Sequence, residues 1–409
     1  MTTLDPDARV LFITRSVRMF GYGFLAVVLV LYLAEIGLPA EAIGLLLSLT
    51  LAGDTLISLW LTTNADRIGR RRVLIAGALL MAAAGAVFGL AREPAILLVA
   101  AAVGVISPSG NEVGPFLAVE QASLTQRVSG ARRTGVFAWY NLVGSVATAC
   151  GALAAGAVAQ ALQASGATPV DSYRPIVFGY AGIGLLLAAV FTRLSPAIEA
   201  TPARESAIAG TRFGLHRSRG VVLRLSALFS LDAFAGGLIT QSLVAYWFTV
   251  RWGVEPAILG AIFFGANILA AVSALSAARL AGRFGLINTM VFTHLPSNVL
   301  LILVPVMPTL PLAVAVLLAR FSISQMDVPT RQSYTMAVVD PDERSAAAGV
   351  TGIARTTGSA LSPPLAAPLL ASASLAAVPF YLAGGLKIVY DLILYRLFRS
   401  APTPEESGR

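Results

Sequence analysis

Ionisable side chains stand inside apolar runs at several points of this sequence. The stretch ISPSGNEVGPFLAVEQA places Asn111, Glu112 and Glu120 in a run that is otherwise apolar enough to enter a lipid bilayer. An ionisable group near the centre of a bilayer costs several kcal/mol of free energy if it faces lipid. We therefore expect Asn111 and Glu112 to face water or a partner. Glu120, two helical turns further on, is expected to pair with Arg15 or Arg18.

An early apolar run carries three polar residues on one helix face. Arg15, Arg18 and Tyr22 are three and four residues apart, so they share one stripe of a helix. Lys387 and Asp391, four apart near the end of the chain, are predicted to form a purely structural ion pair. Other polar or charged side chains in apolar runs are Asp54, Asp232, Gln241, Arg320, Gln325, Asp327, Arg331 and Arg355.

Carboxyl groups in such surroundings suit proton transfer. A carboxyl that is shielded from water favours its neutral form, and a nearby arginine reverses this preference. A conformational change that moves an arginine can therefore load or release a proton. Our candidates for this role are Glu112, Asp232 and Asp327, in that order. The alternative is that these carboxylates form static ion pairs, as Asp327 can with Arg331 four residues away.

The composition indicates a membrane protein. Of 409 residues, 56% are hydrophobic and 12% are charged, and the mean hydropathy is +0.78, whereas soluble domains carry roughly 25% charged residues. The single cysteine, Cys150, excludes an internal disulfide, and two histidines are too few for a histidine-rich metal site. No motif indicates catalysis or a cofactor. The net charge of +8 comes from arginines in short loops, which orient a membrane protein, so we expect no nucleic-acid partner.

Twelve apolar segments are long enough to span a bilayer. They lie at about 9–35, 42–63, 73–91, 95–125, 134–163, 175–193, 220–250, 256–281, 286–306, 311–339, 346–372 and 375–398. The predicted fold is an all-α membrane protein with twelve transmembrane helices in two pseudo-symmetric halves, 1–194 and 220–399. A cytoplasmic linker, 195–219, and a tail, 400–409, complete the chain. Arginines concentrate in alternate loops, which predicts a multi-pass protein of the cell membrane (inner or plasma membrane) with both termini cytoplasmic.

The two halves resemble each other in sequence. A shift of 216 residues aligns GLLLSLTLAGDTLISLWLTTNADRIGRRR with GAIFFGANILAAVSALSAARLAGRFGLIN without a gap. The same shift pairs Gly21 with Gly237, Gly37 with Gly253, Gly44 with Gly260, Arg67 with Arg283 and Gly69 with Gly285. This register predicts an internal repeat of six spans.

The loop after the second segment resembles a family signature. It reads TTNADRIGRRRVL from position 62. This resembles the signature loop of the major facilitator superfamily, in which a Gly and three further residues precede Asp-Arg-x-Gly-Arg-Arg. The matching residues are Asp66, Arg67, Gly69, Arg70 and Arg71. Thr62 replaces the first Gly, which puts the usual close helix approach in doubt. The span count and the repeat extend the resemblance over the full chain.

The resemblance implies where the chemistry takes place. In this family spans 1, 4, 7 and 10 line a central cavity, and the substrate binds near the midplane between the halves. The signature loop would latch the halves in the outward-facing state, with Asp66 at the start of span 11, near Ser345. The expected cavity residues are Arg15, Arg18, Tyr22, Asn111, Gln241, Gln325 and Arg331.

These observations predict a secondary active transporter that moves a small solute by alternating access, coupled to protons and exporting. It would work as a monomer in the lipid bilayer, without a metal or cofactor. A drug-exporting branch of the family stays open, although span 5 reads NLVGSVATACGALAAG and lacks the Gly-Pro antiporter signature. The alternatives are a carrier or exchanger of organic or phosphorylated anions, gripped by arginines, and a ligand sensor that does not transport.

Overall fold

Helices make up every regular element that the structure describes. The computed structural model describes residues 5–127, 130–199, 215–340 and 343–399. The central part of the predicted linker and the predicted tail lie outside these ranges. The all-α prediction is confirmed for the described residues.

The first six predicted spans are helical in the predicted order. They correspond to α1 (Pro6–Ala26) with α2 (Leu29–Glu35), α3 (Ala40–Thr63), α5 (Arg70–Leu90), α6 (Pro94–Val103) with α7 (Phe116–Arg127), α8 (Gly130–Ala164) and α9 (Pro169–Phe191). A short helix, α4 (Ala65–Ile68), lies in the signature loop, and a 3-10 turn, η1 (Pro196–Ile198), begins the linker.

The second six predicted spans are also helical. They correspond to α10 (Arg219–Gly237) with α11 (Gln241–Trp252), α12 (Pro256–Phe284), α13 (Leu286–Leu303) with η3 (Val304–Val306), α14 (Leu310–Phe321) with α15 (Asp327–Ala337), α16 (Arg344–Leu361) with α17 (Pro363–Ala371), and α18 (Val378–Phe398). Each of the twelve predicted spans therefore corresponds to one or two helical segments in the described ranges.

Several spans are interrupted. In the described ranges, eight helical segments are long and apolar enough to cross a bilayer, and α1 with α2, bent by 41°, makes a ninth. The other three predicted spans, 4, 10 and 11, are each divided into two shorter helices. The breaks in spans 4 and 11 lie at stretches rich in proline and glycine, SPSG and VGP in span 4 and SPPLAAP in span 11. Spans 1, 4, 7 and 10, which the family resemblance places at the cavity, all contain a break.

The chain divides into two compact units. Unit 1 comprises Met1–Arg204 and Thr240–Asn267, and unit 2 comprises Glu205–Ile239 and Ile268–Arg409. α11 packs against α2 and so belongs to unit 1. Compact units reflect which segments touch in one conformation, so the predicted halves 1–194 and 220–399 stay a prediction.

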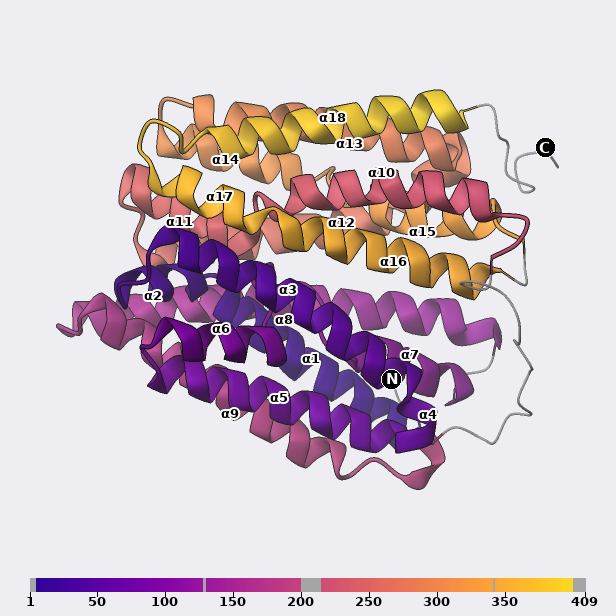
Figure 1. Ribbon diagram of the computed structural model, residues 1–409, viewed down its shortest axis with the longest axis horizontal. Helices are drawn as coiled ribbons and strands as arrows, with labels where there is room; N and C mark the ends of the chain where they lie inside the picture. Colours follow the sequence, from indigo (N-terminus) through magenta and orange to yellow (C-terminus); the bar gives the residue numbers. More distant parts are fainter. Residues whose placement is uncertain (1–4, 128–129, 200–214, 341–342, 400–409) are drawn as a thin grey trace. The chain divides into compact units, whose positions relative to one another are not determined.

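Unit 1 is built on close contacts between α1 and α8 and between α5 and α9, which run side by side (Figure 1). Small residues allow these backbones to approach. A Cβ at Gly23 of α1 would lie 2.0 Å from the carbonyl oxygen of Thr148, and one at Gly151 of α8 would lie 2.1 Å from that of Phe20. Bulk at either position would force the two helices apart.

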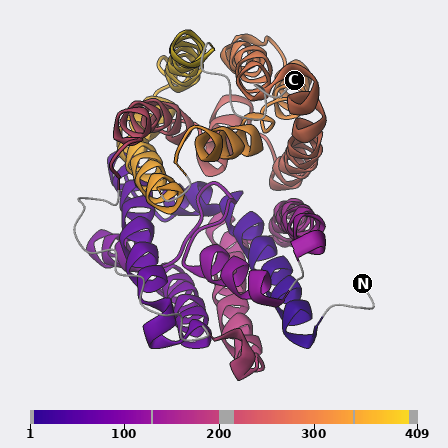
Figure 2. The same ribbon diagram turned by 90° about the vertical axis from the view of Figure 1, so that its right-hand side faces the viewer.

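Unit 2 repeats this arrangement with α10 against α16 and α13 against α18. A Cβ at Gly237 would lie 2.4 Å from the carbonyl oxygen of Ser359, and one at Gly358 would lie 2.3 Å from that of Ser230. Figure 2 shows most helices of each unit nearly end on. The buried apolar cluster of unit 2 contains Leu225, Leu228, Phe229, Ile287, Met290, Val291, Tyr334, Tyr390, Leu394 and Phe398.

Backbone conformation supports the sequence repeat. Gly37 and Gly253, paired by the shift of 216, both have positive φ, at 89° and 61°. Gly69 and Gly285 form a second pair with positive φ, at 103° and 85°. An L-residue with a side chain rarely adopts this region, so glycine is needed at all four positions. The aligned residues therefore end equivalent helices in equivalent ways.

Candidate functional site

The break in span 4 supports the site in unit 1. Between α6 and α7, residues 104–115 leave the helical ladder, and Gly110 and Gly114 have positive φ. The freed backbone groups bond to side chains of other helices. The hydroxyl groups of Tyr180, Ser242 and Tyr22 donate to the carbonyls of Val105, Pro108 and Val113 at 2.8, 2.6 and 2.9 Å. The backbone N–H of Gly114 donates to Asp54 Oδ1 at 2.6 Å.

These contacts explain how an irregular segment persists at this depth. Unsatisfied N–H and C=O groups are not tolerated in hydrocarbon, so non-helical backbone survives only where protein or a water-filled cavity satisfies it. The segment is therefore held by spans 1, 2, 6 and 7. Tyr22, predicted to line the cavity, is fully buried and holds Val113 in place.

Glu112 projects from this segment between the two arginines of span 1. Arg15 Nη1 donates to Glu112 Oε2 at 2.7 Å, and Arg18 Nε donates to Glu112 Oε1 at 2.9 Å. The glutamate side chain is 15% exposed. The expectation that Glu112 faces a partner is confirmed.

The second glutamate of span 4 completes the network. Arg18 Nη1 and Nη2 each donate to Glu120 at 2.7 Å, so the predicted pairing of Glu120 is confirmed with Arg18. Tyr140 of α8 also donates its hydroxyl hydrogen to Glu120. Arg15 in turn donates to the carbonyl of Tyr140 at 2.9 Å. Two arginines thus balance two glutamates in a buried cluster.

Aromatic rings complete the packing around these arginines. The Arg15 guanidinium lies 4.3 Å from the centroid of Tyr140, and that of Arg18 lies 4.5 Å from the centroid of Phe116. A cation over a ring face gains electrostatic stabilisation, which is larger away from water. These rings keep both arginines oriented toward Glu112.

Asn111 and Gln241, two predicted cavity residues of unit 1, have side chains that form few or no hydrogen bonds in the described residues. Asn111 is exposed, while its backbone carbonyl accepts from Ser107 at 2.6 Å. Gln241, at the start of α11, accepts from Asn267 at 3.2 Å, but its Nε2 is buried without a partner in the described part of the chain. A Cβ at Gly110 would lie 3.6 Å from this amide. The unused donor therefore sits beside the break in span 4.

Unit 2 contains a second buried charge cluster, centred on Asp232. Lys387 Nζ lies 2.6 Å from Asp232 Oδ1, and Arg331 Nη1 lies 3.0 Å from Asp232 Oδ2. Arg331 also contacts Asp327 Oδ2 at 3.1 Å, which confirms the pair predicted from their spacing. All three predicted coupling carboxylates are thus paired with cations.

The prediction of an ion pair between Lys387 and Asp391 is wrong. Lys387 pairs with Asp232, and Asp391 bonds to His294 Nδ1 at 2.9 Å and to Asn298 Nδ2 at 2.9 Å. The spacing of four residues would allow contact, but a closer carboxylate on α10 takes the lysine. His294 and Asn298 were not predicted. The sequence feature that could have identified them is the one used for the other sites, namely that both are polar residues inside an apolar run, here 286–306.

Two arginines of unit 2 have no ion pair in the described residues. Arg320 of α14 and Arg355 of α16 are half-buried, and each has a buried Nε without a hydrogen-bond partner. Gln325, another predicted cavity residue, donates its backbone N–H to Ser273 at 3.2 Å, and its side chain is half-buried.

The signature loop is held within unit 1 by carboxylates. Arg70 Nε donates to Asp66 Oδ1 at 2.9 Å. The backbone N–H groups of Arg70 and Arg71 donate to the Glu199 carboxylate at 2.6 and 3.3 Å, which caps the start of α5. Glu199 was not predicted, because nothing in the linker sequence indicates which helix end it reaches. The latch between Asp66 and span 11 stays a prediction.

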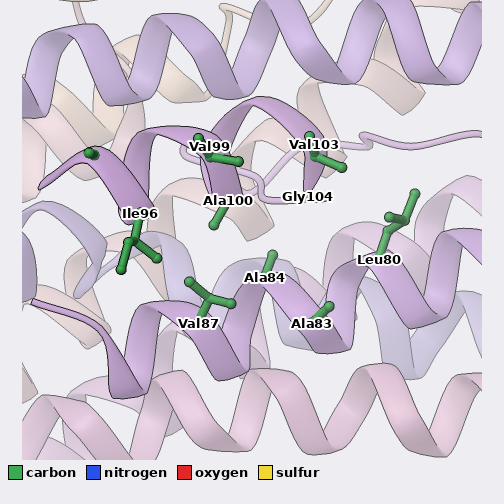
Figure 3. Close-up of a pocket in the computed structure, with 10 residues that line it drawn as sticks. Leu80, Ala83, Ala84, Val87, Ile96, Val99, Ala100, Val103 and Gly104 are labelled. Carbon is green, nitrogen blue, oxygen red and sulfur yellow. The ribbon is translucent and has the colours of Figure 1, made fainter. Parts of the chain in front are cut away.

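A groove of about 470 Å³ lies between α5 and α6 and is entirely apolar. Figure 3 shows Leu80, Ala84 and Val87 of α5 opposite Val99 and Val103 of α6. Solute sites need a few polar groups that fix the orientation of the ligand. This groove offers none among its lining residues, so it is not a candidate for the solute site.

Comparisons with known proteins agree with this architecture. A sequence model described as Major Facilitator Superfamily matches residues 11–363. An uncharacterized membrane protein of Saccharomyces cerevisiae, YJR124C, is 30% identical over 421 residues, covering 96% of this chain and 94% of that protein.

Solved structures of low sequence identity share the fold. A mutant of the nucleoside transporter NupG has a TM-score of 0.76 at 13% identity and covers 96% of this chain and 100% of its own. A D-xylose-proton symporter has a TM-score of 0.72 at 14% identity, covering 98% and 99%. A bacterial homolog of the human lysosomal transporter Spinster, in an inward-facing and occupied conformation, has a TM-score of 0.70 at 16% identity, covering 96% and 95%.

Proposed function

The chain belongs to the Major Facilitator Superfamily, and from this premise we propose that it is a secondary active transporter that exports a small solute in exchange for protons. Membership makes it a multi-pass membrane transporter rather than an enzyme. Transport by alternating access would expose one central site to each side of the membrane in turn. The proposed partners are the solute, protons and lipid.

The observation that carries the proposal is the position of Glu112. This carboxylate lies in the break of span 4 and is shared by Arg15 and Arg18 of span 1. Ionisable residues within membrane spans usually mark substrate or ion pathways. A solute or proton that competes for one of these two ion pairs would change the contact between spans 1 and 4. Binding would thereby be linked to helix movement.

Proton coupling is assigned to the carboxylates Glu112, Asp232 and Asp327. Each is held by at least one cation, so each can take up a proton only when that cation moves away. Such a requirement links the charge state to conformation, as a coupled carrier needs. One solved structure that shares the fold is a D-xylose-proton symporter, which supports the proton as the coupling ion.

The solute would bind among the polar residues predicted for the cavity. The proposed set is Arg15, Arg18, Tyr22, Asn111, Gln241, Gln325 and Arg331. Asn111 and Gln241 are the strongest candidates for direct contact, because one is exposed and the other has an unpartnered buried donor in the described residues. Arg15, Arg18 and Arg331 already hold carboxylates, so they would respond to the solute through those pairs.

A second candidate function is transport of an organic or phosphorylated anion. It is favoured by Arg320 and Arg355, whose buried Nε atoms have no partner in the described residues. A guanidinium matches carboxylate and phosphate oxygens in geometry and charge. Under this alternative an anionic solute would supply the missing acceptors.

Flux measurements in proteoliposomes separate these functions. A thermal-stabilisation screen of the purified protein against cationic drugs and anionic metabolites selects the solute to test. Uptake of a cation driven by an outward proton gradient would support the leading proposal. Counterflow of an anion that is lost in Arg355→Gln would support the alternative. Saturable binding without any flux would contradict both and indicate a sensor.

The orientation in the membrane is a further proposal. We place both termini in the cytoplasm and the loop at Thr168 outside, in the cell membrane, with the monomer as the working unit. The excess of arginine in alternate loops supports this orientation. Tags at both termini should be protected from outside reagents and a tag at Thr168 should be reachable. One tag on the wrong side would contradict the topology.

A further inference from the structure

We propose that Asp54 of span 2 is a further proton-binding residue of unit 1, and that its protonation releases the broken segment of span 4. This inference rests on the proton coupling proposed above. It adds a carboxyl that lies outside the set Glu112, Asp232 and Asp327. In this role Asp54 would control the position of Glu112.

Asp54 lies well inside a membrane helix. α3 extends from Ala40 to Thr63, and its one other acidic residue, Glu41, is exposed in its first turn. Asp54 is half-buried, and its Oδ1 accepts from the backbone N–H of Gly114 at 2.6 Å and from the Ser58 hydroxyl at 3.2 Å. A functional role is the default hypothesis for an acidic residue placed at such depth.

Asp54 differs from Glu112 and Glu120 in having no cation beside it in the described residues. In the described ranges no lysine, arginine or histidine lies within ion-pair distance of Asp54. Arg15 and Arg18 are already balanced by Glu112 and Glu120. Ionised Asp54 would therefore leave this cluster with one net negative charge in the membrane. A proton on Asp54 removes that charge.

The other groups facing Asp54 do not supply a compensating charge. Glu112 acts on it as a like charge, and the nearby hydroxyls of Tyr22 and Tyr180 donate to the carbonyls of Val113 and Val105. α6, which packs against α3, carries no titratable residue.

The shorter helices that contact α3, namely α2 and α4, also place no cation beside Asp54. The titratable residues of α2 do not compensate the charge of Asp54, because Tyr32 donates to the carbonyl of Phe88 and Glu35 is exposed. In α4, Asp66 pairs with Arg70, and Arg67 is exposed. Neither helix brings a cation to Asp54.

Protonation of Asp54 would act on the backbone it holds. An ionised carboxylate is a strong acceptor for a backbone N–H, and hydrogen bonds to a charged partner are roughly twice as strong as neutral ones. Binding of one proton converts the carboxylate to a carboxylic acid, with no other bond made or broken, and weakens the bond from Gly114. Glu112 lies two residues before Gly114, so the loosened segment would carry Glu112 away from its arginines.

Infrared difference spectroscopy can test the protonation directly, without a solute. Acidification of wild-type protein in lipid should produce the carbonyl-stretch band of a protonated carboxyl. One component of this band should be lost in Asp54→Asn and kept in Glu112→Gln and in the exposed control Glu35→Gln. It should shift in Ser58→Ala, which removes one hydrogen bond to the carboxylate. A band that is unchanged in Asp54→Asn would overturn the proposal.

Thiol labelling can test the release of the segment. Asn111→Cys, with Cys150→Ala, places a cysteine on the broken segment, and its labelling rate is normalised to that of unfolded protein at each pH. Acidification should accelerate labelling when Asp54 is present. In Asp54→Asn the rate should stay at the acid value at every pH. A pH response that persists in Asp54→Asn would contradict the mechanism.

These outcomes separate the inference from the function on which it rests. If Asp54→Asn does not fold, Asp54→Glu should retain a titrating band at a shifted frequency, and an unshifted band would overturn the assignment. Wild-type transport that ignores a pH gradient would contradict the proposed proton coupling whatever the spectra show. Coupled transport in wild-type protein together with an unchanged band in Asp54→Asn would contradict only the role of Asp54.

Discussion

Arg18 and Glu120 form a bidentate ion pair, in which Nη1 and Nη2 of the arginine each donate to a carboxylate oxygen at 2.7 Å. Neither side chain is exposed to solvent. The third nitrogen of Arg18, Nε, donates to Glu112. One buried arginine thus joins a structural carboxylate to one that we assign to coupling. The two carboxylates on the same span should therefore respond differently to substitution.

Loss of the Glu120 charge should destabilise the fold. In Glu120→Gln the amide NH₂ would face a guanidinium nitrogen, and a buried cation that loses its partner costs about 3–5 kcal/mol of stability. We expect a lower melting temperature in detergent and lower expression. The exposed control Glu41→Gln should stay within about 0.5 kcal/mol of wild type. A Glu120→Gln protein that melts with the wild type would contradict a structural role for this pair.

Glu112→Gln should change transport more than stability. It mimics the protonated state and retains an oxygen that can accept from one arginine. Exchange of solute between two pools should continue, while net transport should no longer respond to a pH gradient. Proteoliposome flux with and without the gradient measures both. Well-folded Glu112→Gln protein that is still driven by protons would remove Glu112 from the coupling set.

A glutamate just before α16 should make stability depend on pH. Glu343 accepts from the backbone N–H groups of His216, Arg217 and Ser218 at 2.6, 2.8 and 2.9 Å. Burial acts to raise the pKa of Glu343, but these hydrogen bonds outweigh it and lower the pKa to about 2. The stabilisation is present above the unfolded pKa of about 4.3 and is lost as the pH falls toward the folded value.

Melting temperatures of wild type and Glu343→Gln should show this dependence. The gap between them should be full at neutral pH and should close on acidification. The exposed control Glu93→Gln should give a small gap at every pH. A constant gap for Glu343→Gln would show that the carboxylate is not stabilised by the start of α10.

The packing of α1 on α8 should be intolerant of a single methyl group. A Cβ at Gly151 would lie 2.1 Å from the Phe20 carbonyl oxygen, a backbone atom that cannot move alone. We expect Gly151→Ala to lower stability by about 1–3 kcal/mol, as overpacking does. The control Gly182→Ala, in α9, meets nothing within 4 Å and should be neutral or stabilising. Equal melting temperatures for the two variants would contradict this contact.

The signature loop gives a test of the proposed latch. Asp66 and Asp171 each form an ion pair with an arginine close by in sequence and are 64% and 60% exposed. Exposed pairs contribute about 0–1 kcal/mol, so neither Asp66→Asn nor Asp171→Asn should affect folding much. Cysteines introduced at the outer ends of spans 1 and 7 report this state. Only Asp66→Asn should reduce their labelling, because it should favour the inward-facing state. Equal labelling in both variants would leave Asp66 without a latch role.

The sequence alone was sufficient for the features that depend on local chemistry. Twelve apolar segments, the breaks at proline and glycine, and the pairing of Asp327 with Arg331 all follow from composition and helical periodicity. Glu120 was predicted to meet Arg15 or Arg18 because a charge in an apolar run must find an opposite charge. Such rules identify which residues need partners.

Tertiary structure decided which partner each residue has. Lys387 bonds to Asp232, 155 residues away, although Asp391 is one helical turn along. Asp54 bonds to the Gly114 amide and leaves the arginines to Glu112 and Glu120. Helical spacing fixes only the face on which a side chain lies, whereas the attraction between charges depends on the distance across packed helices. That distance is set by how closely glycine-lined backbones approach, which the order of residues along one helix does not determine.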